Sequence, residues 1–175
     1  ERPELFMKTI GWRAVGHQAH IRIRKDSTWN VPEPELTLVV NAHGDIVGYT
    51  IGNDVSSRDI EGSNALYLPQ AKMYNGSAAI GPAIQLAPAD AMRALPVHIE
   101  IERGGAVCFS GDTSISNMKR NLEELAAYTR LELDFPNGFM LMTGTGIVPD
   151  ESFTLSQGDV VKISIGDLML VNTVG

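Results

Sequence analysis

The feature that most constrains this chain is a set of charged residues inside an apolar, strand-rich stretch, residues 30–77. The prolines at positions 32 and 34 push the residues before them, Val31 and Glu33, into extended backbone. Side chains two residues apart on a strand share a face, so Glu33 and Glu35 point the same way. Two adjacent carboxylates repel each other unless a proton or a cation lies between them. On this pair alone, an exposed acidic strand start and a cation site are both open.

A second strand brings a third carboxylate to the same place. Residues 36–40 and 47–51 are typical of strands, and a turn around Gly44 separates them, which predicts an antiparallel hairpin. The open end of this hairpin places Asp54 beside Glu33 and Glu35. Three carboxylates without Cys or His suit Mg²⁺, Mn²⁺ or Ca²⁺ rather than zinc. We therefore predict that Glu33, Glu35 and Asp54 bind a divalent cation, Mg²⁺ first, with Mn²⁺ or Ca²⁺ as alternatives.

Two basic residues follow the acidic ones. Arg58 comes four residues after Asp54, so a single helical turn would bring it alongside that carboxylate. There it would grip a substrate carboxylate or orient the metal ligands, while a surface ion pair with Asp59 is the simpler alternative. Lys72 stands in an apolar setting, where a semi-buried ammonium would balance the carboxylates and donate to a substrate oxygen. Lys8, near the start of the chain, is either a contact for a substrate carboxylate or a surface lysine, and we favour the surface lysine.

Composition limits the function classes. The chain has 175 residues, enough for one domain, and it is 43% hydrophobic and 20% charged, as expected of a globular protein with a core. Its formal net charge of −7 argues against a nucleic-acid partner. No apolar run is long enough to span a membrane, and no signal peptide pattern is present. A single cysteine, Cys108, excludes an internal disulfide and fits a reducing, cytoplasmic setting.

The rest of the chain reads mostly as strands. We expect strands at 19–24, 97–103, 106–110, 139–142, 155–165 and 168–174, with a two-residue hairpin turn at Gly104-Gly105. One clear helix is predicted over 116–128, with Ser116 as its N-cap. Because strands far outnumber helices, we predict a mainly β (α+β) fold, a mixed β-sheet roll with few helices, in which residues 1–175 form a single domain.

Several motifs occur in a defined order: P-E-x-E-L from Pro32, Y-T-x-x-N-D-V-S-x-R-D from Tyr49, A-K at 71–72 and G-P at 81–82. In this order they resemble the fumarylacetoacetate hydrolase superfamily, from about residue 2 to the C-terminus. Within it, residues 2–6, 29–36 and 67–74 are most similar to the 2-keto-3-deoxy-sugar-acid dehydratases. The resemblance implies a β-roll that forms a homodimer. It also implies a smaller N-terminal domain, which we expect to be absent because the chain begins at Glu1 without an initiator Met.

The resemblance also implies an activity and the residues that perform it. A Mg²⁺-dependent dehydratase would act on a small-molecule 2-keto acid, a 2-keto-3-deoxy sugar acid, through a metal-stabilised enolate. Glu4 matches the candidate acid/base residue, and Lys72 matches a residue of the catalytic site. Arg58, Lys72 and Thr145 would hold the oxygens of the substrate.

Alternatives remain. The same metal site would suit a hydrolase that cleaves a C–C bond in an acylpyruvate or a fumarylacetoacetate-like acid, or an oxaloacetate-type decarboxylase. Hydrolases of this superfamily use a His–Glu pair to activate water, and the sequence shows no convincing pair. Glu61 also stands where these hydrolases carry an amide. A non-catalytic β module stabilised by Ca²⁺ is the alternative outside enzymes, but such a site needs neither Lys72 nor Arg58.

Overall fold

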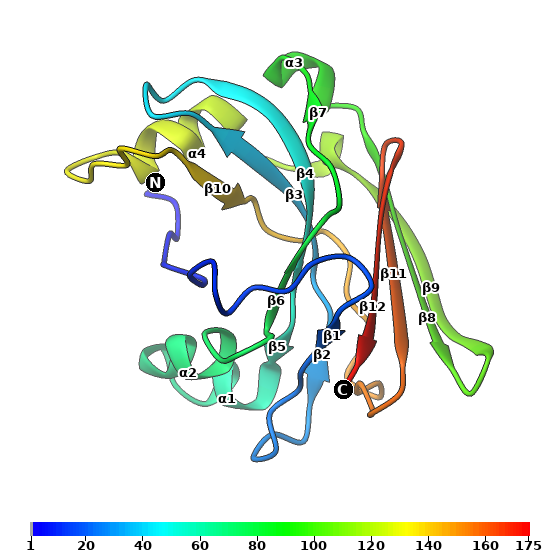
Figure 1. Cartoon of the computed structure of the whole chain (residues 1–175). Coiled ribbons are helices and arrows are strands. Elements are labelled where there is room, and N and C mark those ends of the chain that lie inside the picture. Colours follow the sequence, from blue (N-terminus) through cyan, green and yellow to red (C-terminus); the bar gives the residue numbers. More distant parts are fainter. Residues whose placement is uncertain (1) are drawn as a thin grey trace.

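Two β-sheets face each other across the core (Figure 1). The computed structural model describes residues 2–175. The first sheet has the order β1-β12-β11-β8-β9, with β1 at His20–Ile21, β12 at Leu168–Val174, β11 at Val160–Ile165, β8 at Pro96–Arg103 and β9 at Ala106–Ser114. The second has the order β10-β3-β4-β6, with β10 at Phe139–Met142, β3 at Pro34–Val40, β4 at Ile46–Asp54 and β6 at Ala78–Ile80. Strand β7, Gln85–Leu86, pairs with β4, and β2, Asn30–Val31, pairs with β5, Ser56–Ser57.

The helices of the described chain are short. They are α1 Arg58–Ser63, α2 Leu68–Lys72, α3 Ala89–Met92 and α4 Leu122–Thr129, with 3-10 turns η1 Ala65–Tyr67 and η2 Ile115–Asn117. Helices α1 and α2 lie together near one end of the second sheet, and α4 lies near the other (Figure 1). None of the helices found in residues 2–175 has the length and apolar character needed to cross a membrane. The predicted mainly β fold with few helices is confirmed.

Alternating side chains build the core from the first sheet. Strand β8 buries Val97, Ile99 and Ile101, while the residues between them are less buried. Its antiparallel neighbour β11 places Ile163 opposite Ile99 and Val161 opposite Ile101, so the buried residues of both strands share one face. This period of two is the pattern of a sheet that packs on one side only.

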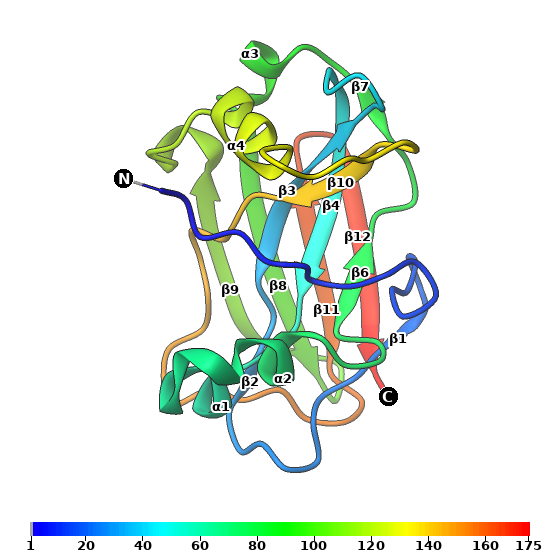
Figure 2. The ribbon, with the colours of Figure 1, turned by 90° about the vertical axis from the view of Figure 1, so that its left-hand side faces the viewer.

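The β3–β4 hairpin differs because it is buried on both faces. Leu36 pairs with Ile51 and belongs to the core, whereas Glu35, the residue before it, pairs with Gly52. Since neighbouring side chains point to opposite faces, Glu35 lies on the side away from the core. On that side the N-terminal segment, residues 2–14, crosses the sheet, as the dark blue part of the chain in Figure 2 shows.

The structure confirms both predicted hairpins and corrects two other elements. Residues 36–40 pair with β4 as expected, and β8 and β9 pair around Gly104-Gly105. The helix predicted over 116–128 begins later, at Leu122, because the side chain of Asn121 caps it by accepting from the N–H groups of Glu123 and Glu124. Only His20–Ile21 of the predicted strand 19–24 pairs with a sheet.

Truncation of a core leucine tests the packing between the sheets. Leu170 in β12 is fully buried, whereas Leu66 in η1 is 83% exposed. We expect Leu170→Ala to lower the free energy of unfolding by about 3 kcal/mol, because the lost side chain leaves a cavity. The matched control Leu66→Ala should change it by less than about 0.5 kcal/mol. Urea unfolding followed by circular dichroism measures both, and equal effects would contradict the position of the core.

Candidate metal centre and active site

Three buried carboxylates meet at the open end of the β3–β4 hairpin. One oxygen from each of Glu33, Glu35 and Asp54 lies within 4.8 Å of the other two. Two local features bring them together. Glu33 and Glu35 are two residues apart in extended backbone, and the N–H of Asp54 donates to the carbonyl of Glu33 at 3.0 Å. The sequence-based prediction that these three side chains converge is therefore confirmed.

The carboxylates lie where water does not solvate them. Glu35 is 2% exposed and Asp54 is fully buried. Glu35 accepts a hydrogen bond of 2.6 Å from the N–H of Gly144, whereas Oδ1 of Asp54 has no hydrogen-bond partner among the described residues. A buried, unpaired carboxylate oxygen is costly, and a cation is the partner that removes the cost. The burial, spacing and oxygen chemistry of this site fit a hard divalent cation.

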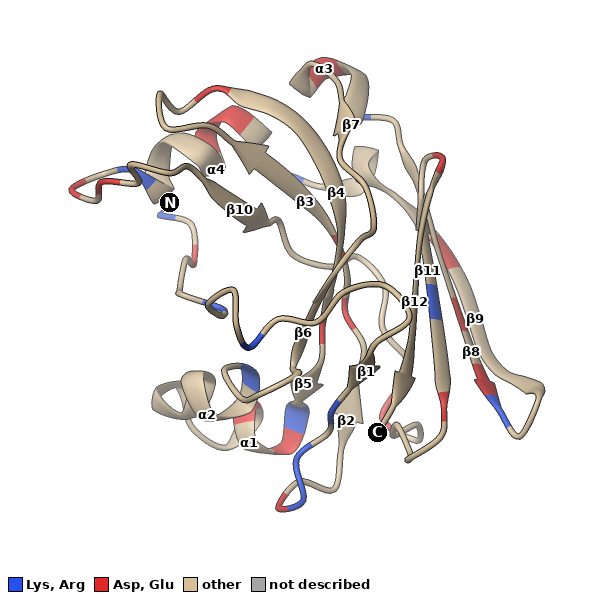
Figure 3. Ribbon diagram, in the orientation of Figure 1, with Lys and Arg blue, Asp and Glu red and all other residues tan. Residues whose placement is uncertain are grey.

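Three basic residues form ion pairs with the three carboxylates: Lys8, Arg58 and Lys72. Figure 3 colours basic residues blue and acidic residues red along the ribbon, and both colours occur at helix α1. The Lys72 ammonium, on α2, lies 2.9 Å from Glu33 and 2.9 Å from Asp54, and it also donates to the hydroxyl of Ser56. Its predicted place among the carboxylates is confirmed. The Arg58 guanidinium lies 3.0 Å from Glu33, so the prediction that it returns to Asp54 is wrong. Arg58 begins α1 instead of ending a turn that starts at Asp54, and this start directs it toward Glu33.

The alternative ion pair between Arg58 and Asp59 is also not what the structure shows. The Asp59 carboxylate accepts from the hydroxyls of Ser27 and Thr28, on the loop before β2. Arg58 instead has Glu61 at 3.9 Å as its second acidic neighbour. Glu61 is also 3.7 Å from the Lys72 ammonium. Glu61, which stands where the hydrolases carry an amide, is therefore a fourth acidic group beside the site.

Lys8 is a site residue that the sequence interpretation missed. Its ammonium lies 3.0 Å from Glu35 and donates to Oδ2 of Asp54, and its side chain is only 16% exposed. Interpretation as a surface lysine was wrong because it considered charge and position in the sequence alone. The available signal was that Lys8 stands in the same short motif as Glu4, four residues earlier.

The charges of this cluster stabilise one another. Burial by itself lowers the pKa of Lys8 and of Lys72, but the neighbouring carboxylates outweigh burial and raise both above the ordinary lysine value. Burial raises the pKa of Glu35, while Lys8 opposes this shift. Both lysines are therefore firmly cationic at neutral pH. The arrangement can hold a metal cation with its carboxylates and an anionic substrate with its ammonium and guanidinium groups.

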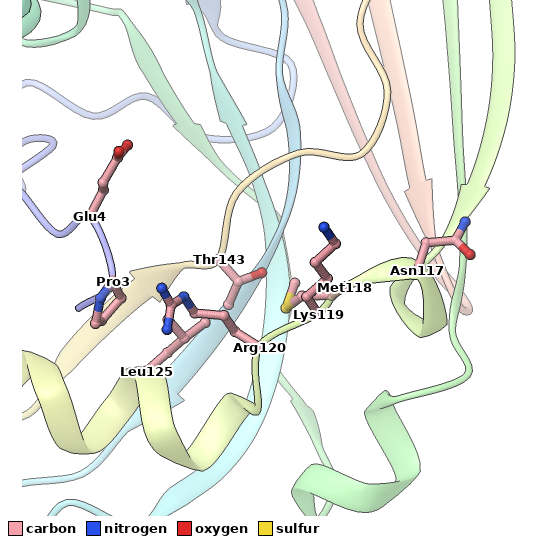
Figure 4. A pocket seen from close by; sticks show the side chains of 8 residues that line it. All are labelled: Pro3, Glu4, Asn117, Met118, Lys119, Arg120, Leu125 and Thr143. Atoms are coloured by element: carbon pink, nitrogen blue, oxygen red, sulfur yellow. The ribbon is translucent and has the colours of Figure 1, made fainter. Parts of the chain in front are cut away.

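A cavity of about 480 Å³ lies between the N-terminal segment, the start of α4 and the end of β10 (Figure 4). Its lining consists of Pro3, Glu4, Asn117, Met118, Lys119, Arg120, Leu125 and Thr143. Glu4 is exposed, and among the described residues no hydrogen bond or ion pair joins it to the three carboxylates. The structure thus places Glu4 over the cavity, separate from the charged cluster. Thr143 links the two regions, because it precedes Gly144, whose N–H binds Glu35.

Thr145 lines a second, smaller cavity of about 160 Å³ that also includes Thr143 and Gly144. Its hydroxyl donates to the carbonyl of Ile147 at 2.9 Å. The oxygen keeps acceptor capacity, but its proton is used within the turn. The structure thus brings Thr145 near the site through the 143–146 turn, while its contact with substrate stays a prediction.

A search against known families matches the description "Fumarylacetoacetate (FAA) hydrolase C-terminal" over residues 1–175. The chain belongs to the fumarylacetoacetate hydrolase family. The resemblance found in the motifs is thereby confirmed, and so is the β-roll that it implied.

Two similar proteins of this family are named as dehydratases. The chain is 42% identical over 170 residues to 2-dehydro-3-deoxy-D-arabinonate dehydratase of Saccharolobus solfataricus. This alignment covers 95% of this chain and 56% of that protein. It is 45% identical over 167 residues to a probable 2-keto-3-deoxyxylonate dehydratase of Haloferax volcanii, covering 94% and 57%. A solved structure of 2-keto-3-deoxy-D-arabinonate dehydratase, complexed with magnesium and 2,5-dioxopentanoate, superposes with a TM-score of 0.94 at 42% identity. That match covers 99% of this chain and 62% of the solved one.

Removal of the Lys72 charge tests how the carboxylates are stabilised. Lys72→Met leaves Glu33 and Asp54, both buried, without this partner. Because breaking a buried ion pair leaves uncompensated charge, we expect the free energy of unfolding in EDTA to fall by about 3 kcal/mol. Lys25→Met, at an exposed turn lysine, should change it by less than about 0.5 kcal/mol. Urea unfolding of both variants is the measurement, and similar stabilities would show that Lys72 is not needed to neutralise the cluster.

Proposed function

We propose that this chain carries the active site of a Mg²⁺-dependent dehydratase that acts on a 2-keto-3-deoxy sugar acid. The observation that carries the proposal is a buried carboxylate triad with an unpaired oxygen, paired with three basic side chains. Glu4 lines a separate cavity. Two relatives at 42% and 45% identity are named as dehydratases of such acids, which supports the reaction class. The chain spans 56% and 57% of the lengths of these two relatives.

Glu33, Glu35 and Asp54 are the residues that would hold the metal ion. When bound, the ion supplies Lewis-acid chemistry that polarises the keto group of a 2-keto acid and makes its C3 proton easier to remove. Support for magnesium comes from the chemistry of the oxygen ligands and from the related structure complexed with magnesium and 2,5-dioxopentanoate.

The protein side chains perform the remaining steps. Lys72 and Arg58 bind the negatively charged oxygens of the substrate, and Thr145 holds a further oxygen from the 143–146 turn. Glu4, directly or through a water that it orients, takes the C3 proton as general base. The hydroxyl at C4 then leaves as the C3–C4 double bond forms, and the proton that Glu4 has taken converts it to water. For a 2-keto-3-deoxy pentonate, this gives a 2-keto-3-ene acid with a hydroxyl at C5. Transfer of a proton from C5 to C3 produces an enol at C4–C5, which tautomerises to 2-oxoglutarate semialdehyde.

The structure offers little to the alternatives. Among the described residues, no hydrogen bond or ion pair joins a histidine to the three carboxylates. A purely structural Ca²⁺ site has no use for the Lys72 and Arg58 cations that approach Glu33. Assembly as a homodimer stays a prediction from the resemblance.

Product analysis tests the reaction. With Mg²⁺ and a panel of 2-keto-3-deoxy pentonates and acylpyruvates, we expect loss of one water from a pentonate, detected by mass spectrometry. Asp54→Asn should abolish this conversion and Mg²⁺ binding by calorimetry, because the ligand set loses a charge at its most buried member. Asp134→Asn, at an exposed position, is the matched control. Addition of water to an acylpyruvate, with cleavage into two fragments, would contradict the dehydratase assignment and support the hydrolase.

A second experiment separates Glu4 from the metal site. Because Glu4 has no contact with the three carboxylates, Glu4→Gln should leave Mg²⁺ affinity unchanged. The loss of a general base should lower kcat by about 100-fold or more. Glu151→Gln, at an exposed loop position, serves as control. Steady-state kinetics and calorimetry read the two effects separately, and near-normal kcat would remove Glu4 from the mechanism.

A further inference from the structure

Lys8 occupies a position that the proposed function does not use. Its ammonium donates to Glu35 and to Oδ2 of Asp54, two of the three carboxylates that would hold the metal ion. An ammonium and a divalent cation that need the same oxygens compete for them, since like charges in direct contact repel strongly in a buried site. Lys8 is therefore either a rival of the metal ion or a residue that moves when the ion binds.

The segment that carries Lys8 has few other attachments. Among the described residues, none of residues 2–9 forms a backbone–backbone hydrogen bond with the rest of the chain, and regular bonding begins at Ile10 and Arg13. Leu5, Phe6 and Met7 are all exposed. The ion pairs of Lys8 with Glu35 and Asp54 are thus the main polar contacts that fix this segment over the second sheet. Glu4 lies in the same segment, over the cavity.

We propose that the Lys8 ammonium and a divalent cation compete for Glu35 and Asp54, that the cation displaces the ammonium from these carboxylates, and that the displacement frees the segment carrying Glu4. The inference rests on the metal site of the proposed function. Metal binding and the placement of residues 2–9 are then linked, so each changes the equilibrium of the other.

Lys8, and not Lys72, is the lysine that leaves. Lys72 belongs to α2, is 4% exposed and has a third partner in Ser56. Lys8 extends from a segment without backbone hydrogen bonds to the sheets, and Phe6, with its ring 5.1 Å from the ammonium, belongs to the same segment. Its departure therefore breaks only side-chain contacts with Glu35 and Asp54, whereas departure of Lys72 requires a helix to move.

The first test is a metal titration. We expect Lys8→Met to bind Mg²⁺ about fivefold more tightly than the unchanged protein in calorimetry, because the ion no longer displaces an ammonium. Lys8→Arg retains the cation and should bind Mg²⁺ like the unchanged protein or more weakly, and Lys25→Met controls for loss of an exposed charge. Equal or weaker Mg²⁺ affinity of Lys8→Met would overturn the inference. Absence of Mg²⁺ binding in every protein would instead overturn the proposed metal site.

The second test uses the unchanged protein and so does not depend on how a variant folds. Trypsin cleaves after lysine only when the side chain is accessible, and the Lys8 side chain is engaged in ion pairs with Glu35 and Asp54. We expect Mg²⁺ to accelerate cleavage after Lys8, while cleavage after the exposed Lys25 keeps the same rate. Mass spectrometry of the fragments over time gives both rates. Cleavage after Lys8 that is unchanged or slowed by Mg²⁺ would show that the ion does not free this segment.

Discussion

The charged cluster on the outer face of the β3–β4 hairpin depends on one constraint, which is that three carboxylates removed from water need cations. Glu33, Glu35 and Asp54 are almost fully buried, and burial of unpaired carboxylates costs several kcal/mol each. The surrounding elements supply the compensation: Lys8 from the N-terminal segment, Arg58 from α1 and Lys72 from α2. Helices too short to be stable alone are thus positioned by the charges that they carry to the sheet.

The hairpin itself makes room for this chemistry. Glu35 pairs with Gly52, and a Cβ at position 52 would come within 2.4 Å of the Thr37 hydroxyl oxygen and 2.7 Å of Met142. A side chain there would push these neighbours, on the same face as Glu35, out of place. On the opposite face, Leu36 and Ile51 pack into the core, so the strands that carry the ligands are fixed by apolar contacts. A rigid support of this kind holds ligands in the geometry that a metal ion requires.

The sequence was sufficient for the parts of the site that follow from local rules. The spacing of Glu33 and Glu35, the prolines beside them and the hairpin turn place all three carboxylates, because each rule acts over a few residues. The same rules located α4 only in part, since Ser116 and Asn121 are both capable caps and the choice depends on tertiary packing. Lys8 could not be placed, because residue 8 meets residues 35 and 54 only through the path of an irregular segment.

The two kinds of cation in this site have different consequences. A lysine side chain compensates the carboxylates at the cost of its own desolvation, which is why burial opposes the raised pKa values of Lys8 and Lys72. Each N–H of a lysine ammonium donates in one direction. Lys8 and Lys72 both donate to Oδ2 of Asp54, while Oδ1 of the same carboxylate stays unpaired among the described residues. A divalent ion would be coordinated by oxygens from several directions at once and carries twice the charge. The side chains alone therefore leave the cluster incompletely satisfied, and this residual cost favours metal binding.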